Sequence, residues 1–175
     1  MNPRTKPRVL IPRAEIEATV KRLASEISRD YRGKNPLLLG ILKGSFMFMA
    51  DLVRQLDFPL EIEFIRLSSY GSGQQTRGKV KVVQGLHLDV TDRHVLVVED
   101  IVDTGITVAF LLEYLKKRKP ASIRLCALTD KPSRRRVPIE IDYKGVTVPD
   151  KFLVGYGLDY DEKYRNLSDI CVLEE

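Results

Sequence analysis

The sequence predicts an α/β domain with a mainly parallel central sheet flanked by helices. Its apolar runs Leu37–Leu42, Val95–Val98 and Ile123–Leu128 have the length of strands buried on both faces, which is typical of parallel sheets. A segment with helical spacing of apolar residues follows each of the first two runs, as expected for helices that cross over a sheet. No linker or repeat divides the 175 residues, so we expect a single domain over residues 1–175.

The segment before the first run is predicted to be an amphipathic helix. Apolar residues between Ile16 and Ile27 recur at helical spacing, Pro12 suits the first turn, and Gly33 suits the end. After the first strand, Lys43-Gly44-Ser45 leads into a second helix with apolar residues from Phe46 to Leu56. A lysine charge, a glycine that allows backbone amides to approach, and a helix start together suit a phosphate group. Turns of this kind are common, so an ordinary loop remains an alternative.

A hairpin is predicted next. Apolar and acidic residues alternate over Leu60–Phe64, which marks a strand with one polar face, and Lys79–Val83 would return beside it. The connection between them, Ser68–Gly78, is polar and rich in glycine. We therefore expect a flexible tip.

The stretch from His94 to Thr107 carries the strongest chemical signal. The buried strand ends at Glu99 and Asp100, Asp103 follows in a short loop, and a helix begins near Ile106. Ligands of open α/β sheets bind at the carboxyl ends of strands, and a helix amino terminus favours phosphate. The carboxylates would repel a bare phosphate, so they must face sugar hydroxyls, a metal or a proton, and a ribose 5-phosphate fits this division. The residues alone also allow an acidic loop that merely caps the helix.

The remainder of the chain completes the predicted sheet. The Ile123–Leu128 strand forms a βαβ unit with the strand before it, and Lys131 follows at the same sheet edge. Pro132–Pro138 is predicted to be an exposed basic loop. Tyr143–Val148 is expected to belong to a smaller, less regular layer.

Composition limits the function classes. Hydrophobic residues make up 43% and charged residues 30%, as in ordinary soluble proteins, and the net charge of +5 lies largely in short clusters that do not indicate nucleic-acid binding. Cys126 and Cys171 lack metal-type spacing, so we expect buried free thiols in a reducing compartment. The sequence shows neither a signal peptide nor a membrane span, and we expect a cytoplasmic enzyme without membrane or nucleic-acid partners.

Several motifs resemble those of the phosphoribosyltransferases, enzymes that use phosphoribosyl pyrophosphate (PRPP). The run Val95–Thr107 resembles the family signature of an apolar strand, two acids and Asp-Thr-Gly-x-Thr. Leu42-Lys43-Gly44 is similar to the pyrophosphate loop of the purine enzymes, in which the Leu–Lys peptide is often cis. Ser69-Tyr70 matches a pair in the mobile lid of the hypoxanthine-guanine enzymes, and Val148–Arg165 is close to their C-terminal pattern. The resemblance implies a phosphoribosyltransferase fold with a small hood region and a flexible lid loop.

The resemblance also implies a reaction and its phosphate sites. A 6-oxopurine, hypoxanthine and also guanine, would take the phosphoribosyl group of PRPP and release pyrophosphate, giving IMP or GMP in purine salvage. Glu99 and Asp100 would hold the ribose hydroxyls, directly or through magnesium-bound water. The 5′-phosphate would lie in the Asp103–Thr107 loop, which contains Thr104, Gly105, Ile106 and Thr107. Lys43, Gly44 and Arg165 would bind pyrophosphate.

The implied base and metal sites use further residues. Asp103 matches the acid that approaches purine N7 as a general base, and Lys131 matches the donor to the 6-oxo group. Phe152 would stack on the base, and the backbone of Leu153 would contact its edge. Mg²⁺ is the implied cofactor, with Asp159 as the direct ligand beside Glu99 and Asp100.

Other readings stay open on the residues. A regulatory protein on the same fold that binds PRPP is the main non-enzyme alternative, although such proteins often lack the acid at Asp103. A PRPP synthetase would need an ATP site and a longer chain. Enzymes for adenine or pyrimidines are disfavoured by Lys131 and by the Phe152–Asp159 match. We expect a homodimer or a homotetramer.

Overall fold

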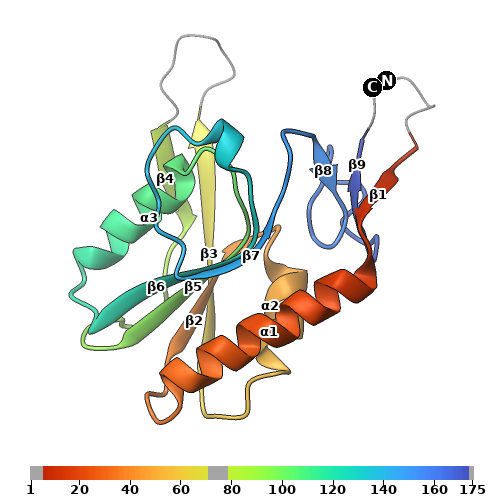
Figure 1. Cartoon of the computed structure of the whole chain (residues 1–175). Helices are drawn as coiled ribbons and strands as arrows, with labels where there is room; N and C mark the ends of the chain where they lie inside the picture. Colours follow the sequence, from red (N-terminus) through yellow and green to blue (C-terminus); the bar gives the residue numbers. More distant parts are fainter. Residues whose placement is uncertain (1–5, 71–78, 174–175) are drawn as a thin grey trace.

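The described chain forms two sheets with helices packed on both faces of the larger one (Figure 1). The structure is a computed structural model, and it describes residues 6–70 and 79–173. The elements are β1 (Arg8–Ile11), α1 (Arg13–Tyr31), β2 (Leu37–Leu42), α2 (Phe46–Val53), β3 (Glu61–Tyr70), β4 (Lys79–Gln84), β5 (His94–Val102), α3 (Ile106–Lys116), β6 (Ser122–Asp130), the short 3₁₀ helix η1 (Pro132–Arg134), β7 (Tyr143–Thr147), β8 (Leu153–Val154) and β9 (Ile170–Val172).

The larger sheet has six strands in the order β4-β3-β2-β5-β6-β7. All neighbours in it are parallel except β3 and β4, which form the predicted antiparallel hairpin. Val95 of β5 pairs with Leu37 of β2 on one side and with Ile123 of β6 on the other. The three apolar runs are therefore the three central strands, and the predicted parallel α/β architecture is confirmed.

Alternate residues of these strands face two separate cores, because successive side chains of a strand point to opposite faces. Leu38, Leu96 and Val98 pack with α1 and α2 on one face. Leu39 and Val97 pack with α3 on the other face. Burial on both faces explains why the central strands contain almost no polar residues until their carboxyl ends.

The smaller sheet has three antiparallel strands in the order β1-β9-β8. It lies beyond the end of the larger sheet that carries the loops after β5 and β6, and it is the hood region implied by the sequence (Figure 1). Because β1 and β9 come from opposite ends of the described chain, neither short strand could be assigned from its local pattern.

One sequence prediction about the layers was wrong. Tyr143–Val148 was expected in the smaller layer, but β7 lies at the edge of the six-stranded sheet and pairs in parallel with β6. An edge strand keeps one side solvated, so its mixed pattern lacks the continuous apolar run of a central strand. Gly145 contributes to this close pairing, because a Cβ atom there would overlap the carbonyl oxygen of Leu128.

Two smaller predictions agree with the fold. Cys126 and Cys171 are both buried and free. Gly33, where the first helix was expected to stop, has a φ of 81°, which favours glycine just after the end of α1. No helix within the described ranges is long and apolar enough to span a membrane.

Candidate active site

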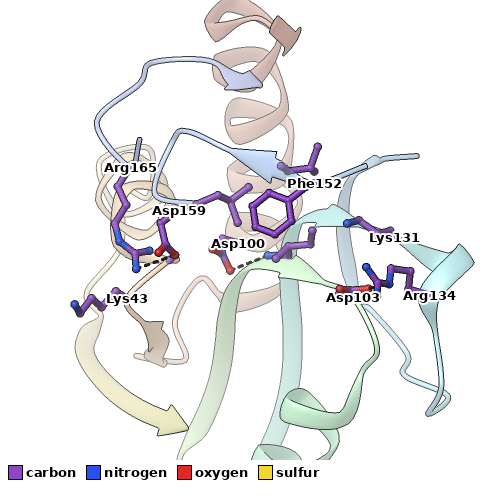
Figure 2. Close-up of a pocket in the computed structure, with 12 residues that line it drawn as sticks. Lys43, Asp100, Asp103, Lys131, Arg134, Phe152, Asp159 and Arg165 are labelled. Carbon is purple, nitrogen blue, oxygen red and sulfur yellow. Dashed lines mark hydrogen bonds and ion pairs between the residues drawn. The ribbon is translucent and has the colours of Figure 1, made fainter. Parts of the chain in front are cut away.

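A pocket of about 340 Å³ opens where the parallel strands end and the hood begins. Figure 2 shows Lys43, Asp159 and Arg165 toward one side of it and Lys131, Asp103 and Arg134 toward the other, with Asp100 between them. The loop after β2, the end of β5, the end of β6 and the hood all contribute. The lining residues are Lys43, Gly44, Asp100, Ile101, Asp103, Lys131, Arg134, Phe152, Leu153, Leu158, Asp159 and Arg165.

The two acids at the end of β5 have different surroundings. Asp100 lines the pocket, and its Oδ1 accepts the backbone N–H of Ile101 at 2.9 Å. Burial raises the pKa of Asp100 to about 6; the Ile101 hydrogen bond and the Arg165 charge act to lower it, whereas the charge of Asp159 raises it. Asp100 and Asp159 both line the pocket.

Glu99 lies outside the residues that line the pocket. Its side chain is buried, and its Oε2 atom has no hydrogen-bond partner. Burial, followed by the charge of Asp100, raises the pKa of Glu99 well above its ordinary value. Of the two acids, only Asp100 lines the pocket in this structure.

The loop after β2 packs directly on Asp100. A Cβ atom at Gly44 would overlap the Asp100 carboxylate, so only glycine fits there. The Leu42–Lys43 peptide is cis. Gly157 of the hood, with a φ of 98°, approaches the carbonyl oxygen of Gly44 in turn. Lys43 is thereby held at the mouth of the pocket.

Arg165 and Asp159 lie with Lys43 on one side of the pocket and form one wall of it (Figure 2). Arg165 Nη2 lies 2.9 Å from Oδ1 of Asp159, and its Nη1 donates to the carbonyl of Gly157 at 2.7 Å. Glu162 accepts contacts from both cations, with its Oε2 2.8 Å from Lys43 Nζ and 3.3 Å from Arg165 Nη2. An anionic group therefore already bridges the two cations of this wall.

The other half of the pocket combines an acid, a buried amine and an aromatic ring. Asp103 Oδ1 is buried without a hydrogen-bond partner, and Arg134 Nε is 3.8 Å from it. Lys131 is 4% exposed and donates from Nζ to the carbonyl of Lys151 at 2.8 Å. Phe152 is half exposed beside this amine, and Leu153 is buried. Together they suit a planar heterocycle with a proton to lose: a carboxylate oxygen without a hydrogen-bond partner, an N–H donor and a ring face.

Comparison with known proteins identifies the family. The phosphoribosyl transferase domain family matches residues 12–161. A hypoxanthine-guanine phosphoribosyltransferase of Streptococcus pneumoniae is 48% identical over 168 residues, which cover 96% of this chain and 93% of that protein. The chain belongs to the phosphoribosyl transferase domain family.

Further relatives and solved structures share this phosphoribosyltransferase domain. The hypoxanthine phosphoribosyltransferase of Haemophilus influenzae is 46% identical, with 95% of this chain and 96% of that protein covered. A hypoxanthine phosphoribosyltransferase structure from Staphylococcus aureus superposes with a TM-score of 0.91 at 42% identity, covering 95% of this chain and 91% of that one. The chain spans only 26% of the length of the bifunctional protein TilS/HprT of Listeria monocytogenes, to which it is 46% identical.

The phosphoribosyltransferase loop after β5 leads into α3, as predicted from Asp-Thr-Gly-x-Thr. Gly105 has a φ of 82° and directly precedes the first residue of α3. Thr104 Oγ1 lies 3.4 Å from the backbone nitrogen of Ile106, and Thr107 is in the first turn. These residues adjoin Asp103 at the pocket, although they do not line it.

The structure gives no direct support for the predicted lid contacts or for the predicted metal site. Ser69 and Tyr70 end β3, where their backbones pair with Val80 and Lys79. Residues 71–78 of the predicted lid lie outside the described residues. No group of three or more His, Cys, Asp or Glu side chains suitable for a metal occurs among the described residues, so Glu99, Asp100 and Asp159 do not form a preassembled site.

Sequence reasoning missed two charged residues of the site. Arg134 is exposed, as predicted for its loop, but it also lines the pocket between Asp103 and Asp150, with Nη1 3.8 Å from Asp150 Oδ1. Glu162 joins Lys43 and Arg165. The position of Arg134, three residues after Lys131, was the one local indication in the sequence that it lies near the pocket. The sequence around Glu162 gives no such indication, because its contacts depend on the fold of the hood.

Proposed function

We propose that this protein is a hypoxanthine phosphoribosyltransferase that also accepts guanine. It transfers the 5-phosphoribosyl group of PRPP to the base, producing IMP or GMP and pyrophosphate in purine salvage. The observation that carries the proposal is the division of one pocket into a base half, with Asp103, Lys131 and Phe152, and a half suited to polyphosphate, with Lys43 and Arg165. Relatives with this activity in their names that align over more than nine-tenths of both chains support it.

In the base half, each proposed role follows from an atom that is available. Asp103 Oδ1 is buried without a hydrogen-bond partner, so it can accept the proton of purine N7. The Lys131 ammonium can only donate, which favours the 6-oxo group over the 6-amino group of adenine. Phe152 lies over the pocket for stacking, and the backbone of Leu153 borders the base edge.

In the phosphate half, backbone N–H groups and cationic side chains are both proposed to bind phosphate. Backbone N–H groups of Gly105, Ile106 and Thr107 at the start of α3, with the Thr104 hydroxyl, are proposed to bind the 5′-phosphate. Lys43, the amide of Gly44 and Arg165 are proposed to bind pyrophosphate, which would displace Glu162 from the two cations. Ser69 and Tyr70 are proposed to contact the substrates as part of the lid loop.

Mg²⁺ is the proposed cofactor, and the carboxylates of the pocket fit it. The charge of Asp159 contributes to the raised pKa of Asp100, and Arg165 is the cation that contacts Asp159. Magnesium commonly takes one or two carboxylates and completes its shell with phosphates and water. Asp159 would hold the ion directly and Asp100 would hold it or the ribose hydroxyls; the ion would neutralise charge on the departing pyrophosphate. For Glu99 to hold the ion or the ribose hydroxyls, its side chain would have to move from its buried position outside the pocket lining.

The proposed setting is a cytoplasmic homo-oligomer, either a dimer or a tetramer. The rival assignment is a regulatory protein that binds PRPP without turnover. The Asp103 oxygen that has no hydrogen-bond partner favours the enzyme, because it can accept a proton from the base.

Steady-state rates test the proposed function. With PRPP and Mg²⁺, we expect turnover of hypoxanthine and guanine, none of adenine, and loss of all turnover in excess chelator. PRPP binding without turnover of any purine would establish the regulator instead. Equal rates with adenine would overturn the substrate assignment.

Lys131→Met tests the base half separately. Removing the donor leaves the buried 6-oxo group unpaired, which costs roughly 1–3 kcal/mol of purine binding, while PRPP affinity should change little. Calorimetric titration with hypoxanthine and with PRPP measures both. Normal hypoxanthine affinity in this variant would contradict the role of Lys131.

A further inference from the structure

One arginine of the basic loop after β6 is turned inward. Arg135 has a side chain that is only 17% exposed. Its Nε donates to the carbonyl of Asp103 at 3.0 Å, and its Nη2 donates to the carbonyl of Val102 at 3.1 Å. The same Nη2 also contacts the carboxylate of Asp130. One planar guanidinium therefore joins three acceptors, a task that suits the fixed fork of arginine.

These acceptors are the ends of two neighbouring strands. Val102 and Asp130 are the last residues of β5 and β6 and pair in the parallel ladder. The next residue on each strand is a proposed base contact, Asp103 after β5 and Lys131 after β6. The backbone N–H of Lys131 also donates to Val102 at 3.0 Å. Arg135 thus links the ends of β5 and β6 directly before the two proposed base-binding residues.

The same loop supports the residues that follow Asp103. The backbone N–H of Val137 donates to the carbonyl of Thr104 at 3.1 Å. A Cβ atom at Gly105 would overlap the carbonyl of Val137 and lie 3.1 Å from Cδ of Arg135. The turn into α3 therefore rests on Arg135 and Val137, with no space for a larger residue.

The charges at this junction favour a fixed geometry. The Asp130 side chain is 9% exposed, and its other cation, Lys144, is 3.9 Å away and half exposed. Loss of Arg135 would leave the buried Asp130 carboxylate with that distant partner alone, and a buried charge without a partner forces local rearrangement. Asp130 is itself not part of the pocket lining, so the pair acts on the pocket through the strand ends.

We propose that Arg135 is a positioning residue that fixes the spacing between Asp103 and Lys131. The inference rests on the proposed function, since it concerns a base whose N7 and 6-oxo group lie on the same edge. The acid must meet N7 while the ammonium meets the oxygen, and a displacement of about 1 Å in such an arrangement costs about 10²-fold in rate. Arg135 touches neither the base nor PRPP in this scheme.

Arg135→Lys is the first test, because it keeps the positive charge but cannot span the carbonyls and the carboxylate at once. We expect kcat with hypoxanthine to fall about 10–100-fold. Affinity for pyrophosphate alone, measured by calorimetry, should change less than about threefold, because Lys43, Gly44 and Arg165 lie away from this junction. Arg136→Met is the matched control. That side chain is exposed and makes no hydrogen bond or ion pair within the described residues, so the control should retain parental rates.

A double-mutant cycle with Asp103→Asn separates positioning from simple structural support. If Arg135 acts by placing Asp103, the further loss caused by Arg135→Lys should shrink to about twofold once the acid is gone, because interacting sites are not additive. Full additivity of the two losses would overturn the proposal. So would parental kcat in Arg135→Lys when the parent itself turns over hypoxanthine.

A folding control and a second variant keep the test valid if Arg135→Lys is poorly folded. Rates are expressed per folded protein from circular dichroism, and if Arg135→Lys does not fold, Asp130→Asn replaces it. That amide keeps the shape and one acceptor oxygen, so a smaller fall in kcat with the same lack of additivity is expected, and an unchanged kcat would overturn the proposal. Failure of the parent to use any 6-oxopurine would refute the proposed function and is thereby distinguished from failure of the Arg135 inference.

Discussion

At the scale of single residues, the position of each carboxylate decides what it can do. Asp100 and Asp103 both border the pocket, but Asp100 is buried, whereas Asp103 is 38% exposed and has one oxygen without a hydrogen-bond partner. The first is suited to a cation and the second to a proton. Glu99, one residue earlier on the strand, is buried outside the pocket lining, with one oxygen that has no hydrogen-bond partner.

Asp100→Asn should change how stability depends on pH. The raised pKa means that the folded protein holds the Asp100 proton more tightly than the unfolded chain does, so this group favours folding in acid, and the contribution is lost as pH rises through about 6. In chelator at pH 8, the variant should therefore be more stable than the parent by up to about 3 kcal/mol. The difference should shrink toward pH 5. Urea unfolding at both pH values measures it, and a constant difference would mean that Asp100 is not protonated near neutrality.

Asp103→Asn should separate chemistry from binding. The amide keeps the size and turn-forming ability of the acid but cannot accept a proton from N7. Turnover should fall about 10²–10⁴-fold, the usual range for loss of a general base. PRPP affinity and melting temperature should stay near parental values. Unchanged turnover would reduce Asp103 to a helix cap, and a large loss of PRPP affinity would assign it to the phosphate loop instead.

At the scale of elements, the loops that end β2, β5 and β6 work as a set. The loop after β2 is pressed on Asp100 through Gly44, the loop after β5 carries Asp103, and the loop after β6 begins with Lys131. Because the strands are parallel and in register, these loops leave the sheet at the same edge. Each loop therefore depends on the close fit of its neighbour.

Gly44→Ala should damage the pyrophosphate loop. The added methyl group would overlap the Asp100 carboxylate, so either the loop or the acid must move. We expect KM for PRPP to rise at least about tenfold, since displacements on the order of 1 Å are costly in such sites. Gly85→Ala is a suitable control because the nearest heavy atom to its Cβ would be 3.6 Å away. Equal KM values in the two variants would show that the loop tolerates the shift.

Sequence patterns anticipated the elements that are buried and local, and missed those defined by distant partners. Val95–Val98 could be assigned because a strand between two others must be apolar on both faces. The short strands β1 and β9 could not, since each becomes a strand only by pairing with the other. In the site, parallel strand ends predicted that Asp100 and Lys131 would meet, whereas the hood residues Phe152 and Asp159 were placed only by resemblance.

The missed residues have the same explanation. Arg134 and Arg135 look alike in sequence, yet one lines the pocket and the other is held by the ends of β5 and β6. Nothing local distinguishes them.

At the scale of the whole molecule, the pocket joins two parts of the fold. Asp100 belongs to the six-stranded sheet, and Asp103 and Lys131 directly follow two of its strands. Phe152 precedes β8 of the hood, and Asp159 and Arg165 lie between β8 and β9. A ligand that contacts both groups ties the two parts together. Binding energy should therefore appear as stability of the complete domain.

PRPP and Mg²⁺ together should raise the melting temperature. A ligand at about 100 times its Kd adds about 2.7 kcal/mol, which corresponds to roughly 5–10 °C for a domain of this size. PRPP in chelator should give a much smaller rise, because Asp100 and Asp159 would then face the pyrophosphate without a cation between them. Scanning fluorimetry with the parent and with Asp159→Asn measures the dependence. The same rise with and without chelator would contradict a metal-linked site.

The pairing of β1 with β9 also has a consequence for the order of folding during synthesis. Arg8 must wait for Val172 before its strand can form, and closing so long a loop is slow compared with local pairing. The six-stranded sheet needs residues only as far as Thr147, so it can assemble on the ribosome earlier. A nascent chain at that stage would already present Asp103 and Lys131 but would lack Asp159 and Arg165. We expect catalytic competence to arrive last, with the segment that completes the small sheet.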